Sequence, residues 1–270
     1  MKEAMITLKG VQKSYGKHHV LKGVDLQINK GDIYGLVGKN GSGKTTIFKV
    51  ILGLSDYKEG ELTIGGFTGK EISQGREKIG FLVGANFFPY MSARRNLEYY
   101  RTLKGIKDKK AIDRVLQMVE LDHVKAPYKS FSMGMKQRLG IANALLGDPE
   151  ILILDEPTNG LDPQGIADVR NLVKRLNQEF GMTIIVSSHI LGELQNTATR
   201  FGIINEGTIM RELDDEDLQL ENNAVRVHVD DLEKAREALQ AAGVTVLKEI
   251  RETRKLEDFY FDLLEGEHHD

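Results

Sequence analysis

The sequence predicts an α/β fold with a mixed, mostly parallel sheet at its core. Three apolar runs, at residues 33–37, 151–154 and 183–189, have the length and composition of buried strands. The segment 164–180 has helical spacing, and Gly181 follows it as glycine often follows a helix C-terminus. Strand, helix and strand in this order, with the strands apolar throughout, indicate parallel strands covered on both faces of the sheet.

The composition narrows the classes of protein to which the chain can belong. The 270 residues carry a net charge of −3, so bulk electrostatics gives no reason to expect a nucleic-acid partner. Cysteine is absent, which excludes disulfides and thiolate metal sites. No run of about 18 apolar residues is present, and the first residues lack the apolar centre of a signal peptide. We therefore expect a membrane role only through a partner.

The motif with the most specific chemistry is a glycine-rich loop after the first apolar run. It comprises Gly38, Lys39, Asn40, Gly41, Ser42, Gly43, Lys44, Thr45 and Thr46, which fits the phosphate-loop pattern. Glycines let the backbone approach a phosphate closely, and the next helix adds the partial positive charge of its N-terminus. We expect Lys44 to bridge the β- and γ-phosphates and the Thr45 hydroxyl to bind Mg²⁺. The alternative is a chance glycine-rich turn, which the flanking strand and helix disfavour.

Two acids, Asp155 and Glu156, directly follow the apolar run 151–154. The carboxyl ends of parallel strands form the edge at which open α/β sheets bind their ligands. We expect Asp155 to hold the Mg²⁺ ion and Glu156 to act as the base for the water that attacks the γ-phosphate. The alternative is an acid pair that only caps the turn through Pro157 and Thr158.

A histidine, His189, ends the apolar run 183–189 and should reach the same edge of the sheet. A neutral imidazole there can donate to a γ-phosphate oxygen and position the attacking water. A structural histidine is the competing interpretation, because a single histidine more often has that role.

Two further segments have both a functional and a structural interpretation. Ser132 and Gly134 precede the helical segment 139–146, and a hydroxyl with a flexible glycine at a helix N-terminus can bind an anion. An ordinary serine cap is the alternative. Tyr15 lies in a polar stretch, where it is either a stacking surface for a base or a turn residue over an edge of the core.

The remaining patterns divide the chain into a large domain and a small one. Further strands are predicted at 5–8, 24–28, 61–64 and 78–83. Helical spacing at 96–103 and 111–119 predicts a helical insertion over about residues 85–148. The predicted domains are residues 1–212, an acidic linker at 213–223 and an α+β appendage at 224–270. Within the appendage we expect strands at 224–229 and 244–247 and helices at 232–242 and 256–264.

The order of these motifs resembles that of the ATP-binding cassette (ABC) ATPases, the nucleotide-binding subunits of transporters. The matching segments are the Walker A motif at 38–45, the signature loop at 131–135, the Walker B motif at 151–156, the loop towards the partner subunit at 159–162, the switch histidine His189 and the adenine-stacking Tyr15. The resemblance covers about residues 5–212. It is specific because six motifs occur in the right order, although Met133 and Met135 stand where the family usually has Gly and Gln.

The resemblance implies an ATP hydrolase that uses ATP and Mg²⁺. In the family two subunits pair head to tail, so Ser132 and Gly134 of one chain would contact the γ-phosphate held by Lys44 of the other. Asp162 would lie in the loop towards that second copy. The resemblance also implies polytopic membrane subunits on separate chains, and a cytoplasmic position on the inner face of the cell membrane. Those membrane subunits would set the substrate and the direction of transport.

Three local sequences further resemble the subgroup associated with bacitracin and lantibiotic export and self-protection. They are the segments 132–138, 187–194 and 256–260. One position departs from the family, because Gly84 stands where the family has Gln, or Glu in this subgroup. Gly84 has no side chain to contact Mg²⁺ and the attacking water. Either Asn86 supplies the contact from a shifted loop, or the contact is lost.

Two other functions compete with that of a transporter subunit. A soluble cassette ATPase acting on ribosomes or DNA would carry two cassettes or very long coiled coils, whereas this chain has one cassette and no sustained heptads. A regulatory nucleotide binder without turnover would not need Glu156 and His189, which are both present. The sequence therefore favours a transport ATPase.

Overall fold

The computed structural model describes residues 3–82, 86–195, 197–214 and 231–244 of the chain. Its packing divides the chain into two compact units, Met1–Leu218 and Gln219–Asp270. Each unit is considered by itself. The division falls between residue 212, where the predicted cassette domain ends, and residue 224, where the predicted appendage begins.

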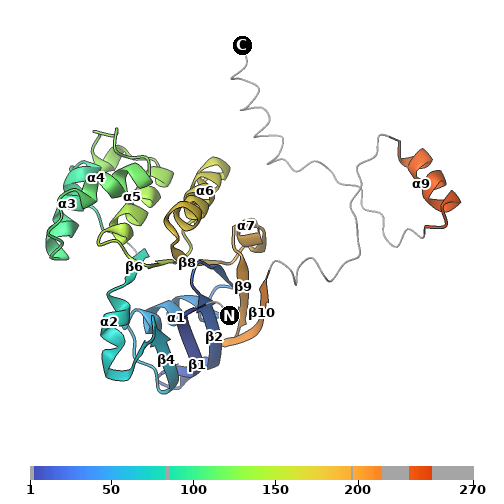
Figure 1. The fold of residues 1–270 in the computed structure, drawn as a ribbon, viewed down its shortest axis with the longest axis horizontal. Helices are drawn as coiled ribbons and strands as arrows, with labels where there is room; N and C mark the ends of the chain where they lie inside the picture. Colours follow the sequence, from blue (N-terminus) through green and yellow to red (C-terminus); the bar gives the residue numbers. More distant parts are fainter. Residues whose placement is uncertain (1–2, 83–85, 196, 215–230, 245–270) are drawn as a thin grey trace, which may run out of the picture. The chain divides into compact units, whose positions relative to one another are not determined.

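A six-stranded sheet forms the centre of the first unit (Figure 1). Across the sheet its strands are β10 (Thr208–Asp214), β9 (Arg200–Asn205), β3 (Ile33–Val37), β8 (Thr183–Ser188), β7 (Ile151–Leu154) and β6 (Ile79–Leu82). All neighbouring pairs are parallel except β10 and β9. The predicted mixed, mostly parallel sheet is confirmed, and the apolar runs form β3, β7 and β8 in its middle.

Both faces of the middle strands β3, β8 and β7 are buried. On β7, Leu152 and Leu154 belong to the core that contains residues of α5 (Met133–Leu145) and α6 (Pro163–Phe180). Ile151 and Ile153, which alternate with them, belong to the core that contains residues of α1 (Lys44–Ile51). Because successive strand residues face opposite sides, a strand covered on both sides is apolar throughout.

A second, antiparallel sheet contributes to the core on the α1 side. Its strands, in spatial order, are β2 (His18–Asn29), β1 (Ala4–Tyr15), β4 (Glu59–Ile64) and β5 (Phe67–Thr68). The sequence predicted only one end of each of the first two strands, residues 5–8 at the start of β1 and residues 24–28 at the end of β2. The hairpin of β1 and β2 extends to the pair Tyr15 and His18, both exposed, because backbone pairing continues where burial has ended.

Helices α3 (Ala93–Leu103), α4 (Ala111–Met118) and α5 lie together beside the sheet (Figure 1). They confirm the helices predicted at 96–103 and 111–119. Their apolar faces form one core, in which Leu97, Ile112 and Leu139 are almost completely buried. The first turns of α3 and α5 are capped by serine side chains, Ser92 and Ser132.

Besides the helices already named, the described part of this unit contains short helices of three to five residues. They are η1 (Gly69–Glu71), α2 (Ile72–Arg76), η2 (Tyr128–Ser130) and α7 (Leu191–Gln195). Helix α6 ends as predicted at Gly181, whose φ of 66° lies in the left-handed region that favours glycine. Among the helices in the described ranges, none combines the length and the apolar character that crossing a bilayer requires.

The second unit is described over residues 231–244. It contains α9 (Leu232–Ala241), which confirms the helix predicted at 232–242. The Asp231 carboxylate begins this helix by accepting hydrogen bonds from the backbone N–H groups of Glu233 and Lys234. The predicted segments 224–229 and 256–264, and nearly all of 244–247, lie outside the described residues.

Candidate active site

The glycine-rich loop 38–43 connects the buried strand β3 to α1. A Cβ atom on Gly38 would lie 2.4 Å from the carbonyl oxygen of Ile204, so only glycine fits there. Gly41 and Gly43 have φ angles of 82° and 115°, which side chains rarely allow. All three glycines of the loop therefore have a steric or conformational reason to be glycine.

Several polar residues lie at the N-terminus of α1 and in the loop before it. No side chain caps the helix, whose first turn contains Thr45 and Thr46, and Asn40 is exposed on the loop before it. The Ser42 hydroxyl oxygen is buried and has no hydrogen-bond partner among the described residues. Buried polar groups are normally paired, and the N-terminal end of a helix attracts anions. The loop therefore fits the phosphate groups of a nucleotide.

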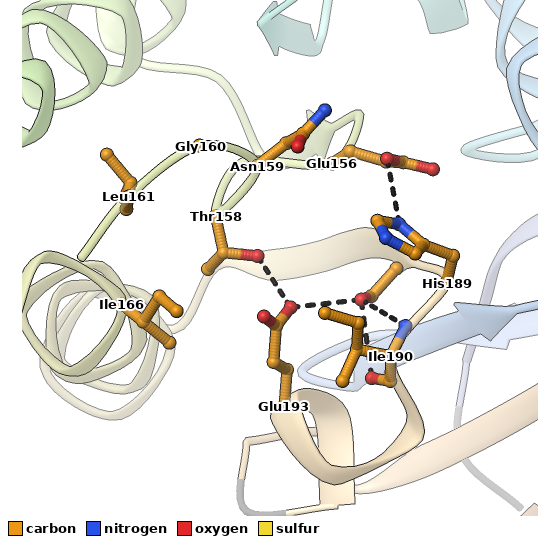
Figure 2. Close-up of a pocket in the computed structure, with 10 residues that line it drawn as sticks. Glu156, Thr158, Asn159, Gly160, Leu161, Ile166, His189, Ile190 and Glu193 are labelled. Carbon is orange, nitrogen blue, oxygen red and sulfur yellow. Dashed lines mark hydrogen bonds and ion pairs between the residues drawn. The ribbon is translucent and has the colours of Figure 1, made fainter. Parts of the chain in front are cut away.

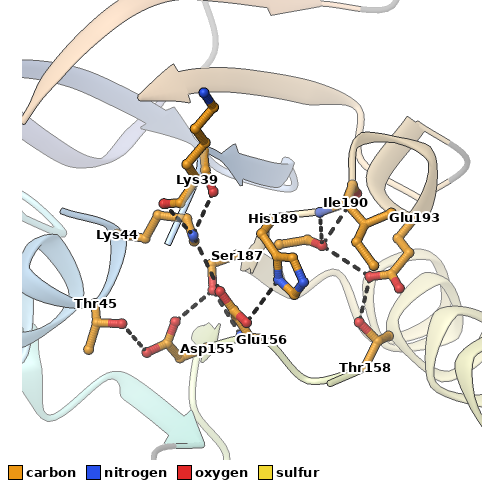
Figure 3. A network of polar contacts seen from close by, with 12 residues as sticks. Lys39, Lys44, Thr45, Asp155, Glu156, Thr158, Ser187, His189, Ile190 and Glu193 are labelled. Carbon is orange, nitrogen blue, oxygen red and sulfur yellow. Dashed lines mark hydrogen bonds and ion pairs between the residues drawn. The ribbon is translucent and has the colours of Figure 1, made fainter. Parts of the chain in front are cut away.

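The Lys44 side chain is 4% exposed, although it carries a charge. Its Nζ donates to the carbonyl oxygens of Gly38 at 2.7 Å and Lys39 at 3.3 Å, and lies 3.3 Å from Oε1 of Glu156 (Figure 3). A buried charge needs partners of this kind. They hold the ammonium group between the glycine-rich loop and the acids after β7.

The two predicted Mg²⁺ ligands are in contact. Thr45 Oγ1 donates to Oδ2 of Asp155 at 2.8 Å, and Ser187 Oγ donates to the other oxygen, Oδ1, at 2.7 Å. Hydroxyl and carboxylate oxygens are the ligands that Mg²⁺ prefers. No cluster of three or more metal-ligating side chains occurs in the part of the chain that the structure describes. The contact of Thr45 with Asp155 fits an ion such as Mg²⁺, which commonly binds one or two protein oxygens together with substrate phosphates.

Glu156 lies between a lysine and a histidine. Its Oε1 atom is 3.3 Å from Lys44 Nζ, and its Oε2 atom is 3.1 Å from Nδ1 of His189. Its backbone φ is 47°, an uncommon value for glutamate, and its N–H donates to Ser187 Oγ at 2.8 Å. The hydrogen bond to Ser187 thus fixes the turn after β7 to β8. In this turn the Glu156 carboxylate points towards Lys44 on one side and His189 on the other.

Strand order explains this convergence. β8 lies between β3 and β7, so the glycine-rich loop, the acids and His189 leave three adjacent parallel strands at one edge. We call Lys44, Thr45, Asp155, Glu156, Ser187 and His189 the sheet-edge network (Figure 3). The structure brings together all five residues for which the sequence predicted phosphate, metal or acid–base chemistry at this edge.

A small hollow of about 120 Å³ adjoins the sheet-edge network (Figure 2). Glu156 and His189 line one side of it, and Thr158 and Glu193 line another. Pockets for drug-sized ligands typically enclose about 300–1,000 Å³. The hollow is therefore smaller than such a pocket, and residues of the turn after β7 and of α7 both line it.

The predicted signature residues lie outside the sheet-edge network. Ser132 is the N-cap of α5, and its exposed hydroxyl accepts a hydrogen bond from the backbone N–H of Met135 at 3.2 Å. Asp162 is likewise the N-cap of α6, with its Oδ1 accepting from Gly165 N–H at 2.8 Å. A Cβ on Gly134 would lie 3.9 Å from Cα of Gly165, so the two helix N-termini are neighbours.

Tyr15 ends β1, and its side chain is about half exposed. Its hydroxyl is 3.1 Å from Ser55 Oγ, and the Lys13 ammonium lies 4.8 Å from the ring centroid. An exposed aromatic face with a cation beside it suits a stacking surface, but the stacking role stays a prediction. Gly84 lies outside the described residues, and Asn86 accepts a hydrogen bond from the Tyr100 hydroxyl through its backbone carbonyl.

Three residues of the site were not singled out from the sequence. Ser187 links Asp155 to the backbone of Glu156, and Thr158 and Glu193 form a hydrogen bond beside the pair of Glu156 and His189. The sequence gives only a weak signal for these three residues. Hydroxyls just before His189 and an acid four residues after it fit many strand-to-helix turns.

Comparison with known proteins identifies the family of the chain. The family model described as ABC transporter matches residues 21–159. The bacitracin transport ATP-binding protein BcrA of Bacillus licheniformis is 42% identical over 81% of this chain and 72% of its own length. The lantibiotic transport ATP-binding protein SrtF of Streptococcus pyogenes is 42% identical over 77% of this chain and 90% of its own.

A solved structure extends the comparison to a functional state. The dimeric, post-hydrolysis state of the ATP-binding cassette MJ0796, bound to ADP and Pi, superposes with a TM-score of 0.68 at 31% identity. The superposition covers 78% of this chain and 98% of that one. The chain belongs to the ABC transporter family of ATP-binding proteins. It is an ATP-binding, ATP-hydrolysing subunit of an ABC transporter.

Proposed function

We propose that the chain drives the export of an antimicrobial peptide of the bacitracin or lantibiotic type through separate polytopic membrane subunits. The proposal is supported by the substrates in the names of BcrA and SrtF, each 42% identical to this chain over more than three quarters of its length. The ATPase would lie peripherally on the cytoplasmic face of the membrane, because ATP is available there.

The single observation that carries the catalytic assignment is the position of Glu156. Its carboxylate lies between Lys44 and His189, and it directly follows Asp155 at the end of β7. Glu156 accepts a proton from the attacking water, His189 orients the carboxylate, and Lys44 neutralises the charge of the γ-phosphoryl group. Catalysis is then mostly positioning and electrostatic stabilisation.

Thr45 and Asp155 are the residues that would hold Mg²⁺. Their contact at 2.8 Å places a hydroxyl and a carboxylate oxygen together beside the phosphate loop. The ion supplies charge neutralisation for the β- and γ-phosphates when it is bound. In the same loop, Gly38, Asn40, Gly41, Ser42, Gly43 and Thr46 would surround the phosphates, and Tyr15 would stack on the adenine.

A second copy of the chain would complete the site. Ser132, Gly134 and Asp162 lie on neighbouring exposed helix N-termini, outside the sheet-edge network. A head-to-tail dimer would bring Ser132 and Gly134 of one copy to the γ-phosphate on Lys44 of the other. The dimeric state of MJ0796 bound to ADP and Pi supports the pairing of two copies.

Replacement of one carboxylate tests the catalytic proposal. Glu156→Gln should reduce ATP turnover by about 10²-fold or more, because the amide cannot accept the proton. ATP binding should persist, and the variant should accumulate as an ATP-bound dimer in size-exclusion chromatography. Glu206→Gln is the matched control, since Glu206 has a similar φ of 45° but an 80% exposed side chain. Near-normal turnover by Glu156→Gln would remove Glu156 as the base.

The transport assignment needs a separate experiment. The native complex is purified from membranes, its other subunits are identified, and its ATP turnover is measured with bacitracin and with a lantibiotic. We expect polytopic subunits to copurify and one of these peptides to stimulate turnover. Copurification with ribosomes or DNA instead would favour the alternative, a soluble cassette ATPase.

A further inference from the structure

Glu193 joins two chain segments that the candidate active site uses together. Its Oε2 atom accepts a hydrogen bond from Thr158 Oγ1 at 2.7 Å and another from Ser188 Oγ at 3.0 Å (Figures 2 and 3). Thr158 lies on the turn after β7, and Ser188 is the last residue of β8. One carboxylate oxygen therefore bridges the ends of two neighbouring strands.

Each end of this bridge is next to a residue of the proposed reaction. Thr158 comes two positions after Glu156, and Ser188 directly precedes His189. The Ser188 hydroxyl oxygen also accepts from the backbone N–H of Ile190 at 3.0 Å, so the peptide after His189 is fixed to the same group. A change in the bridge would therefore alter how Glu156 and His189 face each other.

The carboxylate is attached to an anchored helix. Leu194, the next residue of α7, is 3% exposed and belongs to the core shared with β3 and β8. The backbone N–H groups of Thr197 and Ala198 both donate to the carbonyl oxygen of Leu194, each at 2.8 Å. Hydrogen bonds from hydroxyls to a carboxylate are stronger than those between neutral groups. Glu193 can therefore restrain both strand ends against the core.

We propose that Glu193 is a positioning residue for ATP hydrolysis, which keeps the turn after β7 fixed to the end of β8 so that Glu156 and His189 hold their mutual geometry. The inference rests on the proposed roles of Glu156 and His189. No hydrogen bond or ion pair joins Glu193 to Glu156 or His189 in the described part of the chain, and Glu193 acts through Thr158 and Ser188. Two other links, from Glu156 to His189 and to Ser187, remain when the bridge is removed.

The bridge should affect turnover and leave ATP binding unchanged. A displacement of about 1 Å in a catalytic group can reduce the rate by up to about 10²-fold. Because two other links remain, Glu193→Ala should lower kcat about tenfold. The phosphate loop has no hydrogen bond to Glu193, so KM for ATP should stay within about twofold. Glu193→Gln keeps an acceptor oxygen, and it should recover most of the lost kcat.

Steady-state kinetics of the full-length chain test this prediction. Thr158→Val removes the other end of the bridge without changing side-chain shape, and it should lower kcat about as much as Glu193→Ala. The double variant should be no worse than either single variant, because both remove the same link. Glu179→Ala is the control for loss of a carboxylate, since Glu179 is exposed near the end of α6. Unchanged kcat, or kcat losses that multiply in the double variant, would overturn the proposal.

Amide hydrogen exchange provides a readout that does not depend on activity. In Glu193→Ala and Thr158→Val, the peptide covering residues 156–162 should exchange faster than in the wild-type and Glu179→Ala chains. Unchanged exchange would contradict the bridge, whatever the kinetics show. A wild-type chain that exchanges as expected but does not hydrolyse ATP would instead refute the proposed function. Melting temperatures identify variants that are only unfolded.

Discussion

The sheet-edge network and the N-terminus of α5 differ in how much of their chemistry is complete within one chain. In the sheet-edge network, Lys44 is buried, and Asp155 and Glu156 each have partners from other elements. At the N-terminus of α5, Ser132 is exposed, and its hydroxyl only caps its own helix. Both regions were predicted to contact the γ-phosphate, yet only the first is joined to the phosphate loop.

The difference indicates what each region contributes. A preorganised set of charges can bind ATP and hold the base in one chain, because its side chains are already fixed. An exposed helix N-terminus can complete a site only when another molecule brings an anion to it. Substitutions in the two regions should therefore separate ATP binding from ATP hydrolysis.

The largest effect is expected for Lys44→Ala. Loss of a charged donor should lower ATP affinity by about 10²-fold and abolish detectable turnover, because hydrogen bonds to charged groups contribute up to about 3 kcal/mol. Isothermal titration calorimetry measures the affinity. Lys49→Ala, on the exposed side of the same helix, should bind ATP normally. Unaltered ATP affinity in Lys44→Ala would place the nucleotide elsewhere.

Ser132→Arg should have a different signature. Turnover should fall by about 10²-fold, since a bulky cation replaces the hydroxyl at the shared site. ATP affinity of the monomer should stay within about twofold, because Ser132 lies outside the sheet-edge network. Ser92→Arg removes the equivalent cap of α3, and it controls for a loss of about 1 kcal/mol of stability. A parallel loss of ATP affinity in Ser132→Arg would erase the distinction between the two regions.

A smaller effect is expected for Thr45→Val within the sheet-edge network. Valine keeps the shape of threonine but removes the oxygen that contacts Asp155. The Mg²⁺ concentration for half-maximal turnover should rise about tenfold, whereas ATP affinity in EDTA should not change. If the Mg²⁺ requirement is unchanged, Thr45 is not a ligand and its bond to Asp155 is only structural.

The smallest effect is expected for Tyr15→Ala. An aromatic stacking contact contributes about 0.5–1.5 kcal/mol, so KM for ATP should rise roughly two- to tenfold. Tyr15→Phe keeps the ring and loses only the contact with Ser55, so its KM should be close to that of the wild type. Equal KM values for all three chains would support the alternative, a turn residue at the end of β1.

The sequence placed five of the six residues of the sheet-edge network at one edge of the sheet, for a physical reason. Asp155 and His189 each follow an apolar run, and parallel strands with such runs end at one edge. The backbone conformation of Glu156 and its hydrogen bond to Ser187 were not predictable, because they depend on how β7 and β8 meet. Glu193 was missed for the same reason, as its partners are distant in sequence or lie on another element.

For the fold as well, the buried elements were predictable from the sequence and the exposed ones were not. Continuous apolar runs identified β3, β7 and β8, and helical spacing identified α4 and α6. The antiparallel sheet was seen only as short fragments, since the exposed end of the hairpin at Tyr15 and His18 has no apolar alternation.

The most direct test of the account mixes two inactive chains. Lys44→Ala and Ser132→Arg damage different regions, so a head-to-tail heterodimer contains one site with Lys44 from one chain and Ser132 from the other. With random pairing, an equimolar mixture should recover about a quarter of wild-type turnover, because half of the dimers carry one intact site of two. Turnover no higher than that of either variant alone would contradict a site shared between two copies.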